Sequence, residues 1–217
     1  MTKTEITKRY ILFIISLFFA AIGVAFTKHG ELGVSPTSSV ANILSCKFDS
    51  LSLGTWLIIW NCMLIVGQIA ILRKNFQIIQ LLQVPLSFLF GWFTDLGMWL
   101  VSFIPADSYP VRFIIVIIGI IILGFGVSLS VIANVIMNSA EAFIKAVSDT
   151  VHKEFGNVKI VFDVCCVILA VILSLVFFDF TIVGTREGTI IAAFLTGIVV
   201  KFFSRKLDAP LNQILTK

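Results

Sequence analysis

The sequence predicts an all-α integral membrane protein, a polytopic bundle of about six membrane-spanning helices with two shorter helices between them. Hydrophobic residues make up 59% of the 217 residues and charged residues 13%, whereas soluble domains carry roughly 45–50% apolar and about 25% charged residues. The mean hydropathy is +1.07. A chain of this composition cannot cover itself with water-facing groups. We therefore expect residues 1–217 to form a single membrane domain surrounded by a lipid bilayer.

The expected spans are six apolar stretches that approach or exceed the ~20 residues a helix needs to cross hydrocarbon. They cover residues 10–26, 56–72, 81–104, 111–133, 160–178 and 189–203. The first stretch is similar in length to the apolar region of a signal peptide. Because no small-x-small cleavage site precedes a soluble domain, we interpret it as a retained span.

Two further segments, residues 35–46 and 138–150, look helical but are too short or too polar to cross the membrane comfortably. Ser35 precedes Pro36, which suits the first turn of a helix, and Asn138 is a plausible N-cap. The sequence leaves two alternatives open. The segments are either amphipathic helices on the membrane surface or re-entrant helices that dip into the bilayer.

The topology follows from the basic residues, which gather in four places between or beside the spans. The clusters are Lys3, Lys8 and Arg9; Arg73 and Lys74; Lys145 and Lys153; and Lys201, Arg205 and Lys206. Cytoplasmic loops carry an excess of such residues. If neither short helix crosses, six spans place all four clusters and both termini in the cytoplasm. The net charge of +4 then reflects topology, and we expect no nucleic-acid partner.

An internal repeat is predicted, with one half over residues 10–104 and the other over residues 111–204. Each half has the order span, short helix, span, span. The alignment pairs Gly23 with Gly126, Ser35 with Asn138, residues 52–61 with residues 154–163 (and so Asn61 with Asp163), and Gly91 with Gly197. Three spans per half would invert the second half relative to the first. Inverted repeats with broken helices are typical of transporters whose site lies near the midplane.

Four motifs carry a resemblance to a known family. They are GVSPTSS at residues 33–39, SLSLGTW at 50–56, GWFTD at 91–95 and GTREGTIIAAFLTG at 184–197. In these motifs, and along nearly its whole length, the chain resembles the YczE/YyaS/YitT family of bacterial membrane proteins, in particular the shorter YczE-like members without a soluble C-terminal domain. The resemblance implies a helical membrane fold in the bacterial cytoplasmic (inner) membrane, and it implies no particular activity.

The chain departs from that family's pattern at both short helices. Thr37 stands where members often have an aromatic residue, and Met137, Asn138 and Ser139 replace the second Gly-x-Pro site. These departures would alter what is bound.

The first candidate site is the pair of short-helix N-termini. Helix N-termini present unsatisfied N–H groups and a partial positive charge, so two of them near the midplane would form a polar pocket suited to an anion. The alternative is that these residues are simple caps at the membrane surface. The residues that would line the pocket are Ser35, Thr37, Ser38, Asn138 and Ser139.

Polar and ionisable residues within a bilayer are costly, which makes them functional candidates. Asp163 is the first of these, with Asn61 as its partner in the repeat and Glu141 on the second short helix. Because Lys159 lies about one turn before Asp163, a structural ion pair at the interface is the alternative. Asp95 is a further candidate, although its tryptophan neighbours also suit a position at the membrane interface.

Arg186 and Glu187 precede the last span. The arginine could clamp a substrate carboxylate through its planar fork, or the two could form a solvated pair on an outer turn. Gln80 and Gln83 could donate hydrogen bonds between helices.

These features predict a transporter or channel for a small polar or anionic solute, working by alternating access around a midplane site. The alternative is a non-transporting membrane partner, either the substrate-binding subunit or the scaffold of another membrane or biosynthetic system. Gly119, Gly124 and Gly126 make a homodimer possible, because small residues let helices approach closely. No catalytic, metal-binding or cofactor motif is present, so we expect no enzymatic activity, no metal and no cofactor.

Overall fold

The computed structural model describes residues 2–216, and within that range the chain forms helices and no strands. Six helices are long and apolar enough to cross a membrane, which confirms the predicted fold class. They are α1 (Lys3–His29), α3 (Leu53–Leu72), α4 (Gln83–Val101), α5 (Tyr109–Ala133), α7 (Phe155–Phe177) and α8 (Glu187–Thr216). The two shorter helices are α2 (Pro36–Lys47) and α6 (Ser139–Val151), and two 3₁₀ turns, η1 (Arg73–Asn75) and η2 (Ile78–Leu82), join α3 to α4.

Two of the long helices run well beyond the predicted apolar stretches. α1 begins at Lys3 and α8 continues to Thr216, because polar side chains support extra turns outside the apolar region. At the start of α1 the Thr2 side chain accepts a hydrogen bond from the Glu5 N–H at 3.2 Å. Hydropathy marks the part of a helix that lies in hydrocarbon, and capping decides where the helix ends.

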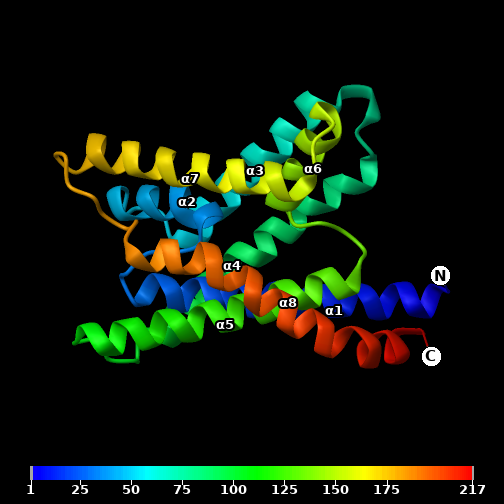
Figure 1. Cartoon of the computed structure of the whole chain (residues 1–217), viewed down its shortest axis with the longest axis horizontal. Helices are drawn as coiled ribbons and strands as arrows, with labels where there is room; N and C mark the ends of the chain where they lie inside the picture. Colours follow the sequence, from blue (N-terminus) through cyan, green and yellow to red (C-terminus); the bar gives the residue numbers. More distant parts are fainter. Residues whose placement is uncertain (1, 217) are drawn as a thin grey trace.

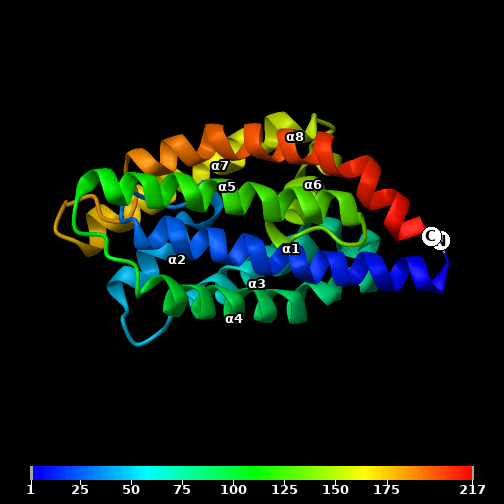
Figure 2. The same ribbon diagram turned by 90° about the horizontal axis from the view of Figure 1, so that it is seen from below.

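Four of the six long helices form one layer in the order α4, α1, α5, α8 (Figure 2), and α1 packs most extensively against α5. Glycines permit this close packing. A Cβ at Gly23 would overlap the backbone of Leu123, and a Cβ at Gly126 would overlap Ala20. The two helix backbones are therefore in direct contact, as small residues allow in membrane proteins.

The same packing removes the reason given above for a homodimer. Gly119 lies against Thr27 of α1, and a Cβ there would be 2.8 Å from the Thr27 nitrogen. Gly124 lies against Val199 of α8 in the same way. These glycines pack within one chain and do not form a free face for a second copy, and a homodimer stays a prediction.

The short helices belong to a second layer with α3 and α7, in which α2 packs on α7 and α3, and α6 packs on α3 and α7 (Figure 1). Ser39 of α2 is fully buried and donates to the Cys166 carbonyl at 3.3 Å. At the start of α6, Ser139 is also buried, and its hydroxyl lies 3.1 Å from that of Ser87. Both short helices begin inside the bundle, which favours the re-entrant alternative over a surface position.

The bundle has two distinct ends, which we call the termini end and the far end. Both chain termini and the α3–α4 connection lie at the termini end (Figures 1 and 2). At the far end α1 stops, α4 stops and α5 starts. There the Nε2 atom of His29 lies 2.7 Å from the Ile104 carbonyl oxygen, and Arg112 pairs with Glu31 at 2.7 Å.

The order long, short, long, long occurs twice along the chain, as the predicted repeat requires. Several contacts also correspond: α2 packs on α7 as α6 packs on α3, and α1 packs on α4 as α5 packs on α8. One correspondence is missing, because α3 packs closely on α4 whereas α7 and α8 have no comparable contact. Inverted symmetry of the halves 10–104 and 111–204 stays a prediction.

Candidate functional site: a polar cavity between two short helices

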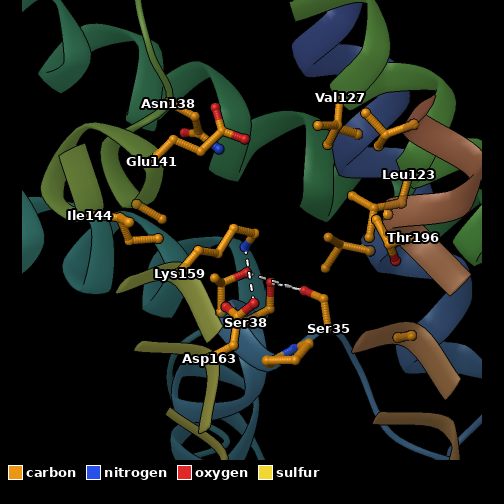
Figure 3. Close-up of a pocket in the computed structure, with 18 of the residues that line it drawn as sticks. Ser35, Ser38, Leu123, Val127, Asn138, Glu141, Ile144, Lys159, Asp163 and Thr196 are labelled. Carbon is orange, nitrogen blue, oxygen red and sulfur yellow. Dashed lines mark hydrogen bonds and ion pairs between the residues drawn. The ribbon is translucent and has the colours of Figure 1, made fainter. Parts of the chain in front are cut away.

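A cavity of about 380 Å³ lies between the two layers of helices. Both short helices contribute their first residues to its lining (Figure 3). α2 supplies Ser35, Thr37 and Ser38, and the N-terminal turn of α6 supplies Asn138 and Glu141. The two N-termini that the sequence predicts to meet therefore share one cavity.

The two N-termini differ in how they are capped. On α6 the Asn138 Oδ1 atom accepts a hydrogen bond from the Ser139 N–H at 2.9 Å. On α2 the Ser35 side chain caps no backbone N–H and instead lies 3.0 Å from the Ser38 hydroxyl. Unpaired N–H groups of a first turn favour an anionic or hydrogen-bond-accepting partner. In the first turn of α2, Pro36 has no N–H and the Ser38 N–H donates to the Ser35 carbonyl at 3.0 Å. The Thr37 N–H and the hydroxyls of Thr37 and Ser38 are therefore the donors that the α2 end offers an anion.

An ion pair lies beside the start of α2. The Lys159 ammonium is 3.0 Å from Asp163 Oδ2, on one face of α7. In Figure 3 this pair sits next to Ser38 and Ser35. The other carboxylate oxygen, Oδ1, is buried and has no hydrogen-bond partner within residues 2–216. The pair is thus both structural and part of the cavity lining.

Glu141 gives the cavity a second carboxylate. It lies beside Asn138, across the cavity from Leu123 and Val127 (Figure 3). No lysine, arginine or histidine of the described chain lies within 4.0 Å of it. A buried carboxylate without a cation is costly, so Glu141 marks this side as a place for a hydrogen-bond donor.

Asn61 is the most buried polar group on the α3 wall. The residue is 6% exposed. Its side chain lines the cavity and takes part in no hydrogen bond with another described residue. The Trp60 Nε1 and Thr196 Oγ1 atoms are also without a partner in residues 2–216, but both are buried out of reach of the cavity space. Asn61 is therefore the group on this wall that a polar occupant of the cavity would bind.

Most of the remaining lining is apolar, which is typical of sites for small molecules. Leu57, Phe90, Leu123 and Ile144 form much of the wall. A solute held here would contact a few polar groups at defined places and hydrocarbon elsewhere.

The cavity is closed towards the far end by the loop that leads into α2. The Gly188 N–H donates to the Leu32 carbonyl at 2.8 Å, which ties this loop to the start of α8. Gly33, at φ 113°, packs so tightly on Thr189 that no side chain would fit there. We call this contact between the loop and α8 the Gly33 seam.

Towards the termini end the cavity continues between α7 and α8. Phe155, Lys159 and Lys201 line this part, and Lys201 is exposed. A Cβ built on Gly156 or Gly197 would meet nothing within 4 Å. The two helices therefore stand apart where the cavity reaches the termini end.

Seven of the predicted site residues line this cavity: Ser35, Thr37, Ser38, Asn61, Asn138, Glu141 and Asp163. Ser139 lies behind it and holds α6 in place through Ser87. Arg186 and Glu187 do not join them. They pair with each other at 3.3 Å and are exposed, because the start of α8 lies on the far side of the Gly33 seam. Of the two alternatives for Arg186 and Glu187, the structure shows the solvated pair on an outer turn.

Three lining residues were missed from the sequence: Trp60, Thr196 and Lys201. Trp60 precedes Asn61, and Thr196 precedes Gly197 in an apolar span, so their positions next to paired repeat residues were the available signal. Asp95 has a structural role instead. Its carboxylate accepts from the Ser52 hydroxyl at 2.6 Å and the Gly54 N–H at 2.8 Å, and it caps α3.

The fold and the cavity define a multi-pass helical membrane protein with a cavity between two half-length helices, whose first residues supply polar groups to its lining. Residues 7–205 match a family of unknown function, DUF6198. The chain belongs to this family. No curated protein and no solved structure shows significant similarity to it.

Proposed function

We propose that this protein is a transporter or channel for a small polar or anionic solute, which occupies the central cavity. One observation carries the proposal. The N-termini of α2 and α6 open into the same cavity as the unpartnered Asn61 side chain and the Lys159–Asp163 pair. Broken or half-length helices whose ends meet inside a membrane protein are a recurring way to bind polar solutes.

The cavity has two chemically different sides. The start of α2, with the Thr37 N–H and the hydroxyls of Thr37 and Ser38, favours a carboxylate or another hydrogen-bond acceptor. Glu141 on the opposite side favours a hydrogen-bond donor. A solute that carries an acceptor or negative group at one end and a donor at the other would satisfy both sides, and the apolar walls would enclose the part between.

A difference between the two halves supports alternating access. In the first half, Gly54 and Gly91 bring α3 and α4 into contact, and a Cβ at Gly91 would lie 2.6 Å from the Gly54 carbonyl oxygen. The alignment of the halves pairs these residues with Gly156 and Gly197, which have open space around them. We infer that α7 and α8 can close on each other as α3 and α4 already do. Closure there, with opening of the Gly33 seam, would expose the site to the other side.

The positive residues suggest the orientation. The clusters at residues 3–9, 73–74, 145–153 and 201–206 lie towards the termini end, which would face the cytoplasm. The structure described here would then be open to the inside. Placement in the bacterial cytoplasmic membrane rests on the resemblance to the YczE/YyaS/YitT proteins and is part of this proposal.

A non-transporting binding subunit is the second possibility, because it would use the same cavity without needing α7 and α8 to close. Stoichiometric co-purification of a partner, together with ligand binding but no flux into proteoliposomes, would favour it.

The proposal is tested first by ligand-induced thermal stabilisation of the purified protein. A screen covers carboxylates, amino acids, vitamins and nucleobases, since a specific ligand raises the melting temperature by mass action. We expect a hit that is lost in Asn61→Leu and weakened at least tenfold in Asp163→Asn, because both variants remove polar groups of the cavity.

Lys47→Ala is the matched control for these variants. It removes a charge at the end of α2, where Lys47 donates to the Phe177 carbonyl at 2.9 Å outside the central cavity. The hit should survive in this variant. A ligand whose binding responds to Lys47→Ala but not to Asn61→Leu would contradict a central site.

A further inference from the structure

A second cavity of about 470 Å³ lies at the far end, beyond the Gly33 seam. Gly33 and Val34 form its floor, and these two residues directly precede Ser35 of the central cavity. We call this cavity the outer vestibule. Its polar lining consists of Lys28, His29, Glu31, Asn42, Cys46 and Arg186.

The charges around the outer vestibule are mainly positive. Its only lining carboxylate within residues 2–216, Glu31, is held by Arg112 at 2.7 Å. Arg186 pairs weakly with Glu187 at 3.3 Å, through side chains that are 46% and 39% exposed. His29 is engaged with the Ile104 carbonyl.

Lys28 is the exception among these charged groups. No carboxylate of the described chain lies within 4.0 Å of its ammonium, whose contact is the Cys46 sulfur at 2.9 Å. The residue is only partly exposed. A partly exposed ammonium without a counter-charge attracts anions, so an anion near Lys28 and Arg186 would stabilise this arrangement.

We propose that the outer vestibule binds a small solution anion, a carboxylate or an anion of similar size, between Lys28 and Arg186. It is a separate site from the central cavity, because the loop from Leu32 to Ser35 lies between them. This inference does not rest on the proposed transport function, and its test needs no knowledge of the solute that the central cavity holds.

Cys46 serves as a probe of this site because it lines the outer vestibule. The experiment uses the full chain with Cys62, Cys165 and Cys166 changed to Ser, so that Cys46 is the single thiol. The rate of its modification is measured with an anionic reagent, sulfonatoethyl methanethiosulfonate, and with a cationic one, trimethylammonioethyl methanethiosulfonate. The ratio of the two rates is normalised to the ratio for free cysteine, which removes any effect of thiol reactivity.

We expect the normalised ratio to favour the anionic reagent. Lys28→Gln and Arg186→Gln should each lower it by about three- to tenfold, the effect of one charge several ångströms away at intermediate dielectric. Lys47→Gln is the matched control. Like the probe Cys46, Lys47 lies on α2, but its ammonium donates to the Phe177 carbonyl outside the vestibule. The normalised rate ratio of this variant should match that of the parent protein.

Three results would overturn the proposal. They are a cationic preference, a ratio unchanged by both Lys28→Gln and Arg186→Gln, and a Cys46 that neither reagent modifies, since the last would show that the vestibule is closed to solution. Circular dichroism and melting temperature verify that each variant is folded.

Two further measurements distinguish a solution anion from a lipid headgroup. Millimolar acetate or phosphate should slow the anionic reagent in phosphatidylcholine nanodiscs. If these anions have no effect while phosphatidylglycerol in the nanodisc does slow the reagent, the site takes a lipid headgroup and the proposal of a solution anion is wrong.

Discussion

Individual polar residues in this protein divide into those that are satisfied by the fold and those that are not. Gln68 and Gln83 are both buried and hydrogen-bond to each other at 3.1 Å, and they hold α3, α4 and the start of α6 together. Asp95 is fully used in capping α3. Asn61 has no such partner. A polar side chain that the fold leaves unsatisfied in the membrane interior is the better indicator of function.

Asp95→Ala should destabilise the protein by about 2 kcal/mol, because it removes two hydrogen bonds to a charged group at the start of α3. The free energy of unfolding, measured by titration with a denaturing detergent, provides the test. Asp149→Ala is the control, since Asp149 forms an exposed pair with Lys145 and should cost less than about 0.5 kcal/mol. Equal losses in the two variants would show that the Asp95 cap is unimportant.

At the level of elements, the glycines of the two halves separate a closed helix pair from an open one. Gly91→Ala places a methyl group 2.5 Å from Ile58 and 2.6 Å from the Gly54 carbonyl, and should lower the free energy of unfolding by about 1–3 kcal/mol. Gly197→Ala meets nothing within 4 Å, and should be neutral or stabilise α8 by up to about 1 kcal/mol. A marked loss of stability in Gly197→Ala would contradict the separation of α7 and α8.

A bulkier side chain on α7 tests whether α7 and α8 must close. Gly156→Leu should fold and bind the ligand identified by thermal shift, because Gly156 does not line the central cavity. It should abolish flux into proteoliposomes, because it obstructs the helix contact that access to the other side requires. The smaller change Gly156→Ala, in the same open surroundings, should retain part of the flux. Full transport by Gly156→Leu would exclude closure at this point.

The elements themselves were largely predictable, and their relative placement was not. Hydropathy located all six long helices, and the Ser35–Pro36 and Asn138 signals located the two short ones. Whether Arg186 reaches the central cavity depends on the close packing of Gly33 on Thr189, a tertiary contact that no local sequence pattern indicates. The helices against which Gly119 and Gly124 pack could not be predicted for the same reason, since a small residue indicates close approach but not the partner helix.

For the whole molecule, the distribution of basic residues predicts which end faces the cytoplasm. A fluorescent protein fused after residue 217 should be fluorescent in a bacterial host, whereas alkaline phosphatase fused at the same point should be inactive, because the first folds in the cytoplasm and the second needs the periplasm. Fusions in the connection near residue 106, at the far end, should give the opposite result. Active phosphatase at the C-terminus would reverse the orientation and place the outer vestibule inside.

The buried Arg9 links distant parts of the chain in a way that bears on how the protein is made. Its guanidinium donates to the carbonyls of Ile132 and Ala133 at 3.2 Å and to Asn212 at 3.1 Å, and Asn212 lies 203 residues further along the chain. Glu5, one turn earlier, pairs with Arg9 at 3.0 Å within the first helix, so the charge has a partner from the start. The acceptors of Arg9 on α5 and α8 have not yet been translated when this helix forms. The hydrogen bonds of the earliest segment are completed only when the last helix arrives, so this contact couples the beginning of biogenesis to its end.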